Sequence, residues 1–123
     1  MKATFSDKSL NVDFTLADRG NGRMPPQGYL EFLALTSSAK VVVTDSGGLQ
    51  EETTVLSIPC LTMRENTERP ITVSEGSSTL VGNDAGKLAE MLRRVIAGTY
   101  DVGHCPTLWD GKAADRIVDV LLA

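Results

Sequence analysis

Short apolar runs alternate with helical segments over most of this chain, and this alternation restricts the fold more than any other feature of the sequence. Residues 41–43 are three consecutive valines, as expected of a strand that is covered on both faces. Strands and helices that alternate at such spacing form a parallel sheet with helices on its faces. We therefore predict an α/β fold, a three-layer Rossmann-like parallel sheet with helices on both faces. The expected strands lie at 41–43, 59–63 and 79–81.

Two of the expected helices are strongly amphipathic. Leu88, Met91, Leu92, Val95 and Ile96 follow one another at helical spacing and therefore share one face. Asn83 or Asp84 is available as the cap of this helix, and Gly98 as its stop. The same spacing recurs after Asp110 in Ala114, Ile117, Val118, Leu121 and Leu122. Less regular helices are expected from Gly28 to Ser37, over 47–56 and over 70–75.

The first residues differ from the rest of the chain. Apolar and polar residues alternate over 10–16, which favours a half-exposed strand. Turn and breaker residues fill 18–26, which indicates a loop. We therefore divide the chain into an amino-terminal strand and loop segment, 1–27, and a Rossmann-like domain, 28–123.

Composition excludes several classes of protein. The length of 123 residues suits one domain, and 41% hydrophobic with 23% charged residues excludes a disordered or fibrous chain. A net charge of −4 disfavours nucleic acid and anionic membranes as partners. The start lacks a signal peptide, so we expect a cytoplasmic protein. Cys60 and Cys105 are far apart and in no metal-binding spacing, so we expect free thiols, no metal and no cofactor.

The turn after the first predicted strand is the strongest candidate site. Ligands of parallel sheets bind beyond the carboxyl ends of the strands. There, Ser46 offers a hydroxyl, and Gly47 and Gly48 allow an anion to approach the unpaired amides of the next helix. Phosphate is the expected ligand. The alternative is a tight strand-to-helix turn with a Ser or Asp cap and no ligand.

Acidic residues follow this turn. A carboxylate one turn into the helix, from Glu51 or Glu52, is placed to accept hydrogen bonds from ribose hydroxyls. Because adjacent helical residues point in different directions, we expect one of the two to be solvated.

A charged segment follows the second predicted strand and so lies at the same edge of the sheet. Arg64 and Arg69 are placed there to face an anion, and Pro70 suits the first position of a helix. The alternative is a solvated loop with internal Glu–Arg pairs.

The Asp45–Gly48 segment also resembles the sequence around the nucleophile of trypsin-like serine proteases. Such an enzyme needs a histidine base and an orienting aspartate. This chain has His104 as its only histidine, and its alternation of strands and helices contradicts a double β-barrel. We reject this interpretation.

Four segments taken together resemble the C-terminal domain of non-hydrolysing UDP-N-acetylglucosamine 2-epimerases, from about Met24 to the end. They are TDSGGLQEE, IPCLTMRENTERP, EGSSTLVGND and LWDGKAADRIVDVL. The resemblance implies the carboxyl-terminal half of a GT-B architecture, which binds UDP or a UDP-N-acetylhexosamine in the cleft between two domains.

The resemblance also implies roles for individual residues. Ser46, Gly47 and Gly48 would hold the diphosphate. Glu52 would bind the ribose. The two remaining predicted contacts are Phe32, which matches the aromatic residue packed on the uracil, and Arg69, which matches the arginine near the phosphate and sugar end.

The reaction of the resembled family inverts C2 of the sugar through loss of its proton and expulsion of UDP. The acid–base groups for these steps come from an amino-terminal domain with no counterpart here, and His104 is out of register with the family histidine. We therefore expect this chain to bind UDP, to carry no catalytic residue, and to need a separate amino-terminal domain for activity. The sequence leaves the oligomeric state open: an exposed former domain interface could drive self-association into a homo-oligomer. The open alternatives are a regulatory nucleotide-binding module and the donor-binding half of a glycosyltransferase or of a hydrolysing epimerase.

Overall fold

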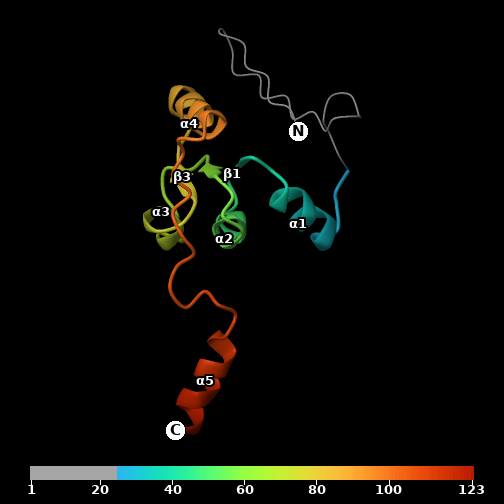
Figure 1. The fold of residues 1–123 in the computed structure, drawn as a ribbon, viewed down its shortest axis with the longest axis vertical. Coiled ribbons are helices and arrows are strands. Elements are labelled where there is room, and N and C mark those ends of the chain that lie inside the picture. The colour runs from blue at the N-terminus through green and yellow to red at the C-terminus, as the bar shows by residue number, and fades with distance from the viewer. Residues whose placement is uncertain (1–24) are drawn as a thin grey trace.

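A computed structural model describes residues 25–123 as a small parallel sheet with helices on both faces (Figure 1). The strands are β1 (Val42–Thr44), β2 (Cys60–Thr62) and β3 (Ser78–Leu80), hydrogen-bonded in the order β1-β2-β3. The predicted α/β fold is confirmed. The strand expected at 10–16, and most of the loop expected at 18–26, lie outside the described residues.

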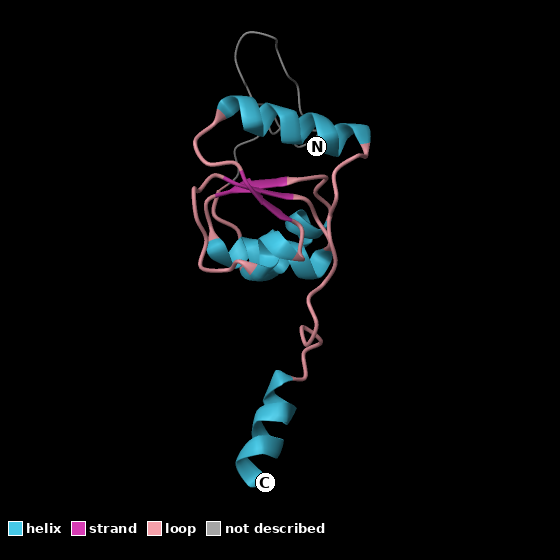
Figure 2. Ribbon diagram, turned by 90° about the vertical axis from the view of Figure 1, so that its left-hand side faces the viewer, coloured by secondary structure: helices cyan, strands magenta, loops and turns pink. Residues whose placement is uncertain are grey.

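Five helices accompany this sheet in the described residues. They are α1 (Tyr29–Ser37), α2 (Gly47–Leu56), α3 (Ile71–Ser74), α4 (Ala85–Ala97) and α5 (Ala113–Leu122). Figure 2 shows α4 above the sheet, with α2 and α3 below it. Helix α1 packs beside α2.

The apolar core lies between the sheet and α4. It consists of Leu61, Val81, Leu88 and Leu92, with Val43 among the partly buried residues that pack against it. Asp84 caps α4 as expected, since its carboxylate accepts a hydrogen bond from the Lys87 amide at 2.9 Å. Gly98 ends the helix in the left-handed conformation, at φ 71°.

The predicted apolar face of α4 is only partly buried. Leu88 and Leu92 are 6% and 2% exposed, but Ile96 in the last turn is 60% exposed. The 13 residues of α4 span about 20 Å, whereas three-residue strands span about 10 Å. The end of the helix therefore extends past the sheet that it covers.

The opposite interface, between the sheet and α2 and α3, is polar. Buried side chains there are Gln50, Thr53, Thr54, Thr62, Thr72, Ser77 and Ser78. Their hydroxyls are largely paired: Thr62 and Ser78 lie 2.9 Å apart across β2 and β3, and Thr53 donates to the Leu49 carbonyl at 2.7 Å. Hydrogen bonds in this layer offset the cost of burying polar groups.

Strand β1 differs from the prediction. Its residues are half-buried, whereas every residue of β2 is fully buried. Within residues 25–123, β1 pairs only with β2 and forms an edge of the sheet. The unbroken valine run correctly indicated a strand, but the strand covered on both faces is the central one.

Tyr100 attaches the segment after α4 to the sheet. Its hydroxyl oxygen lies 2.7 Å from Thr79 Oγ1 and donates to the Ser77 carbonyl oxygen at 2.9 Å. Burial raises the pKa of Tyr100 above its ordinary value, although the hydrogen bond with Thr79 lowers it. The neutral phenol is therefore the form that fits this site.

Helix α5 forms where the sequence predicted it but stands away from the body of the molecule (Figures 1 and 2). No residue of α5 is buried, and Ile117 and Leu121 are 59% and 77% exposed. From the first turns of this helix, the Arg116 guanidinium donates to the carboxylate of Asp110, which precedes the helix, and holds the pKa of Asp110 below its ordinary value. The local pattern thus specifies the helix and not its packing.

Candidate functional site

The carboxyl ends of the three strands lie side by side. Thr44, Thr62 and Leu80 are in register across the sheet. The Met63 amide donates to the Thr44 carbonyl at 2.8 Å, so the segments that follow β1 and β2 begin next to each other. This confirms that the Ser46 turn and the 63–70 segment occupy one edge of the sheet, where ligands of parallel sheets bind.

Ser46 precedes α2 without capping it through its side chain. Its backbone is extended, with φ −82° and ψ 127°, and its N–H donates to Thr44 Oγ1 at 3.0 Å. The Ser46 hydroxyl makes no capping hydrogen bond. The first amides of α2 therefore lack the partner that a serine cap normally supplies, and they remain available to an anion.

The backbone conformation at the start of α2 does not require glycine at positions 47 and 48. Neither Gly47 nor Gly48 has the left-handed conformation that favours glycine. A Cβ added at Gly47 would meet nothing within 4 Å, and one added at Gly48 would meet only Ser46 Oγ at 3.9 Å. At Gly76, by contrast, an added Cβ would lie 2.8 Å from the Thr72 carbonyl oxygen, which is too close for a side chain. The tight-turn alternative therefore does not explain Gly47 and Gly48.

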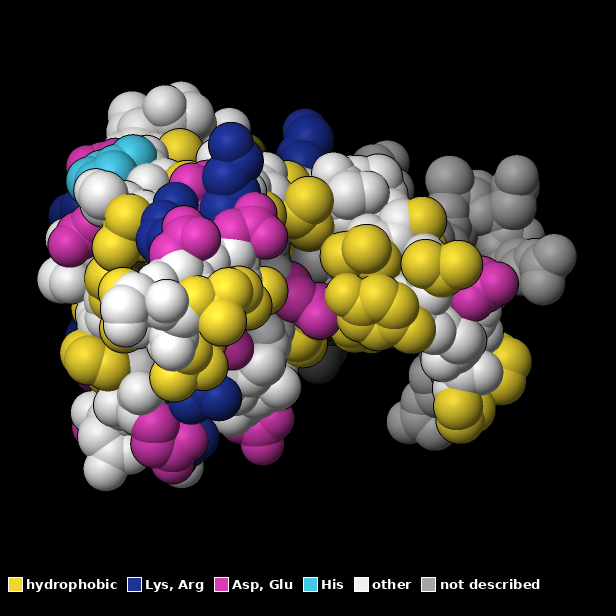
Figure 3. All heavy atoms as spheres, turned by 90° about the horizontal axis from the view of Figure 1, so that it is seen from below, with side chains coloured by type: hydrophobic (Ala, Val, Ile, Leu, Met, Phe, Trp, Pro, Cys, Tyr) yellow, Lys and Arg dark blue, Asp and Glu magenta, His cyan; other side chains and the backbone are white. Residues whose placement is uncertain are grey.

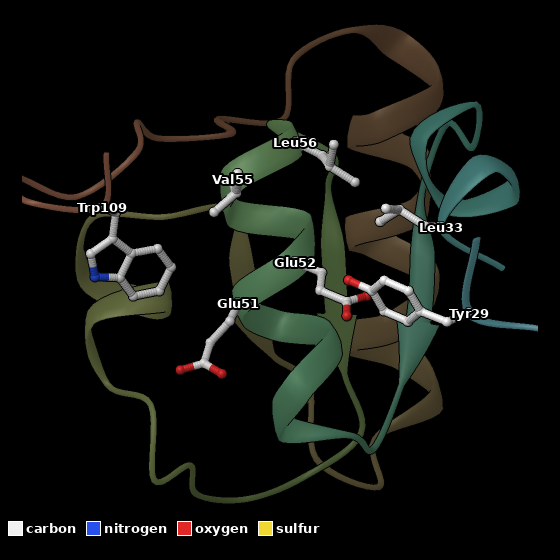
Figure 4. A pocket seen from close by; sticks show the side chains of 7 residues that line it. All are labelled: Tyr29, Leu33, Glu51, Glu52, Val55, Leu56 and Trp109. Carbon is white, nitrogen blue, oxygen red and sulfur yellow. The ribbon is translucent and has the colours of Figure 1, made fainter. Parts of the chain in front are cut away.

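The two glutamates of α2 diverge, and the Glu51 side chain is 44% exposed. Both are half-buried. Glu52 points toward Tyr29, and Glu51 points away from it (Figure 4). Glu51 instead contacts Arg69, with its Oε1 2.9 Å from Arg69 Nε.

A cavity of about 430 Å³ lies along the exposed side of α2 (Figure 4). Its lining is mostly apolar and carries two carboxylates; the residues are Tyr29, Leu33, Glu51, Glu52, Val55, Leu56 and Trp109. Such a pocket suits a ligand that combines a flat ring with hydroxyl groups. Glu52, the predicted ribose-binding residue, is one of the residues that line this cavity.

Phe32 lies on α1 and is 42% exposed, but it does not line this cavity. The aromatic residue of α1 beside Glu52 is Tyr29, which is one helical turn before Leu33. No contact was predicted for Tyr29 from the sequence. Trp109 was missed, because nothing in the sequence indicates that this loop residue returns to α2.

Arg69 is held by carboxylates in this structure. The 2.9 Å contact with Glu51 is ionic and not a hydrogen bond, because the Arg69 Nε–H finds no acceptor in suitable geometry. Glu68 lies 3.9 Å from Arg69 Nη1 and 3.5 Å from Arg64 Nη2. The alternative of internal Glu–Arg pairs therefore describes these arginines, and the Glu51 pair brings Arg69 beside α2.

Other chemistry has little support in the described part of the chain. His104 contacts Glu75 at 3.4 Å and forms no hydrogen bond with Ser46, contrary to a serine protease. Cys60 and Cys105 are free thiols, as expected. Over residues 25–123, no group of three His, Cys, Asp or Glu side chains could hold a metal ion, and no helix has the length and apolar character to cross a membrane.

Comparison with known proteins agrees with the resemblance seen in the sequence. Residues 15–122 match the family model described as UDP-N-acetylglucosamine 2-epimerase, so the match begins within the amino-terminal segment. The chain is 43% identical over 96 residues to the epimerase of Methanocaldococcus jannaschii, which covers 78% of this chain and 26% of the relative. The chain is 40% identical over 101 residues to the epimerase of Escherichia coli K12, and this match covers 78% of this chain and 27% of the relative.

Solved structures give the same result. The M. jannaschii epimerase in complex with UDP-GlcNAc and UDP has a TM-score of 0.68 at 41% identity, covering 80% of this chain and 27% of that one. The Neisseria meningitidis epimerase bound to UDP-GlcNAc has a TM-score of 0.66 at 33% identity, and this match covers 80% of this chain and 28% of that one. The chain thus spans about a quarter of the length of these relatives, and it belongs to the UDP-N-acetylglucosamine 2-epimerase family.

Proposed function

We propose that this chain is the UDP-binding part of an enzyme that interconverts UDP-N-acetylglucosamine and UDP-N-acetylmannosamine. One observation carries the proposal. Gly47 and Gly48 leave open space at the start of α2, although the backbone conformation there does not require glycine. Their place at the carboxyl edge of the sheet is where a phosphate ligand approaches helix amides, and a relative with 41% identity holds UDP in its structure.

The diphosphate would bind at the start of α2. The Ser46 hydroxyl and the amides of Gly47 and Gly48 can donate to its oxygens, and the helix dipole favours the negative charge. Hydrogen bonds from fixed donors to a charged group are short and strong. Because these donors are local, the net charge of −4 does not oppose the binding of one such ligand.

The nucleoside would extend from there along α2. Glu52 follows Gly47 by five residues, about 7.5 Å along the helix axis. Its carboxylate can accept from both ribose hydroxyls, with the base in the cavity beside Tyr29 and Trp109. We assign Phe32 to packing on the uracil and Arg69 to the phosphate and sugar end.

In the epimerisation, this part of the enzyme stabilises the departing diphosphate. When the bond between the sugar and UDP breaks, negative charge develops on the leaving phosphate oxygen. Donors that are already oriented stabilise that charge without reorganisation. They also retain UDP until it is added back to the sugar.

The proton transfer at C2 needs groups that we do not assign to this chain. We propose that an amino-terminal domain, equivalent to roughly the three quarters of the relatives that this chain does not cover, supplies them. The chain alone is then inactive.

Helix α5 provides a surface for such a domain. Seen from below, the molecule carries hydrophobic side chains on its surface (Figure 3). On α5 these are Ile117, Val118, Val120, Leu121 and Leu122. A free apolar helix face of this kind is typical of an interface. We propose that the amino-terminal domain covers it, because the matched stretch is only 26% of the length of the relative, which leaves room for such a domain.

Binding of UDP tests the main proposal. Calorimetric titration should show weak binding to the wild type, and Ser46→Ala should reduce the affinity about tenfold through loss of one donor to a charged group. Thermal unfolding should be unchanged, because the Ser46 hydroxyl does not cap α2. No heat with the wild type, or equal affinity for both proteins, would overturn the assignment.

The partner domain needs a separate test. The amino-terminal part of the M. jannaschii epimerase, expressed alone, should co-elute with this chain and restore formation of UDP-N-acetylmannosamine. Leu121→Asp should prevent both, and the matched variant Asp119→Asn should prevent neither. Self-association of the wild type in place of this complex would argue for a homo-oligomer.

A nucleotide-binding module without catalysis is the second candidate. The observation that favours it is that the two arginines near the site, Arg64 and Arg69, are held in ion pairs with glutamates. This candidate predicts UDP binding without epimerisation in the complex, so the same mixing experiment decides between the two.

A further inference from the structure

Gln50 is a buried polar residue between the glycine pair and the two glutamates of α2. Its side chain is 0% exposed. Its Oε1 lies 2.7 Å from Thr67 Oγ1, which donates to it, and 3.4 Å from Thr72 Oγ1. Thr67 belongs to the 63–70 segment that contains Arg69, and Thr72 lies in α3 directly after it, so Gln50 joins α2 to both.

The same two threonines hold the backbone of Arg69. Thr67 Oγ1 accepts from the Arg69 amide at 3.0 Å, and Thr72 Oγ1 donates to the Arg69 carbonyl at 2.7 Å. Because a hydroxyl has one hydrogen, the shorter contact shows that Thr72 donates mainly to Arg69. The Thr67 hydroxyl therefore links the two residues, because it accepts from the Arg69 amide and donates to Gln50 Oε1. We call this pair of hydrogen bonds the relay.

This contact matters because the 63–70 segment contains no helix or strand of its own. The Arg69 carbonyl accepts from the Thr72 amide at 3.0 Å, but the Arg69 amide donates to a side chain, so side-chain contacts contribute to its position relative to α2. Gln50 acts on the Arg69 backbone through Thr67, and the neighbouring Glu51 contacts the Arg69 guanidinium. Two consecutive residues of α2 thus orient one arginine.

Stability alone does not account for a glutamine at this position. The Gln50 Nε2 group is buried and has no hydrogen-bond partner among the described residues. Burying an unpaired amide donor lowers stability, and an apolar side chain of similar size would avoid that cost. The acceptor oxygen is the part of the side chain that the structure uses.

We propose that Gln50 is a positioning residue, which through Thr67 sets Arg69 at a defined distance from the amides of Gly47 and Gly48. The proposal rests on the proposed function, in which those amides and Arg69 bind the same diphosphate. Gly47 and Gln50 lie one turn apart on one rigid helix, so the relay places Arg69 relative to the anion site.

Thr67→Val and Thr67→Ser form a matched pair for the test. Valine keeps the shape of threonine and removes the hydroxyl, and serine keeps the hydroxyl. In the free protein, hydrogen exchange of the Arg69 amide should accelerate at least tenfold in Thr67→Val and in Gln50→Leu, and change less than about threefold in Thr67→Ser. Equal exchange in Thr67→Val and Thr67→Ser would overturn the relay.

Ligand binding tests the functional part. UDP affinity should fall about tenfold in Thr67→Val and stay near wild type in Thr67→Ser. In an Arg69→Ala background, Thr67→Val should cause no further loss, because the relay acts through Arg69. Affinity for uridine, measured by NMR titration, should be the same in all variants.

The outcomes separate the two proposals. A wild type that does not bind UDP would overturn the proposed function, whereas the exchange experiment would still decide on the relay. Losses that add in the double variant, or that extend to uridine, would show a general structural role and overturn the positioning role of Gln50.

Discussion

Arg69 and Glu51 form an ion pair beside the start of α2, with Nε 2.9 Å from Oε1. The guanidinium that would meet an anion therefore already contacts a carboxylate. A diphosphate at the amides of Gly47 and Gly48 has to share or replace this partner. The pair is half-exposed, so its contribution to stability is about 1 kcal/mol or less.

The adjacent glutamates of α2 should respond differently to neutralisation. Glu52→Gln should lower UDP affinity about tenfold, because a carboxylate that accepts from ribose hydroxyls is lost. Glu51→Gln is the matched control and should cause no loss, since it releases Arg69 for the ligand. Calorimetric titration measures both, and equal losses in the two variants would contradict the assignment of the ribose to Glu52.

Gly47→Ala should separate binding from folding. The methyl group meets no atom within 4 Å, and alanine favours a helix, so stability should be unchanged or rise by up to about 1 kcal/mol. UDP affinity should fall at least about tenfold, because the methyl group fills the space of the anion. Denaturant unfolding and UDP titration measure the two effects.

Gly98→Ala is the control for that experiment. Gly98 has a φ of 71°, so alanine there should cost about 1 kcal/mol of stability and leave UDP affinity unchanged. A Gly47→Ala protein that retains UDP affinity would show that the open space at α2 is not an anion site.

Tyr100 should make the protein sensitive to alkaline pH. Its folded pKa is raised above 10.0, so the folded state retains a proton that the unfolded state loses. Stability is therefore fully present below pH 10 and falls as pH rises through the folded pKa. Tyr100→Phe should cost about 1 kcal/mol at pH 7 and show a shallower decline above pH 10. Thermal unfolding between pH 8 and 11 measures this, and parallel declines would contradict it.

Deletion of residues 113–123 should leave the body of the protein intact. Because α5 buries no residue, the melting temperature should change by less than about 2 °C, and UDP binding should persist. Leu92→Ala, at a core residue that is 2% exposed, should cost about 2–5 kcal/mol in the same assay. A comparable loss from both changes would show that α5 packs on the domain in solution.

Local sequence pattern was sufficient for most of the secondary structure. Helix α2 has the bounds that were predicted, 47–56, and the strands lie within a residue or two of those expected. The order of strand, glycine turn and helix also located the candidate anion site. These features depend on residues that are neighbours in sequence, because caps, breakers and side-chain periodicity act over a few residues.

The sequence by itself therefore determined the α/β class, the position of Ser46, Gly47 and Gly48, and the family. Only the tertiary structure decided what surrounds them. Trp109 beside α2, and the chain of hydrogen bonds from Gln50 through Thr67 to Arg69, join residues far apart in the sequence. Polar side chains in such contacts leave no hydrophobic periodicity, and an amphipathic helix such as α5 does not specify what it packs against. The partners of these groups are set by the way the whole chain folds, which no local pattern records.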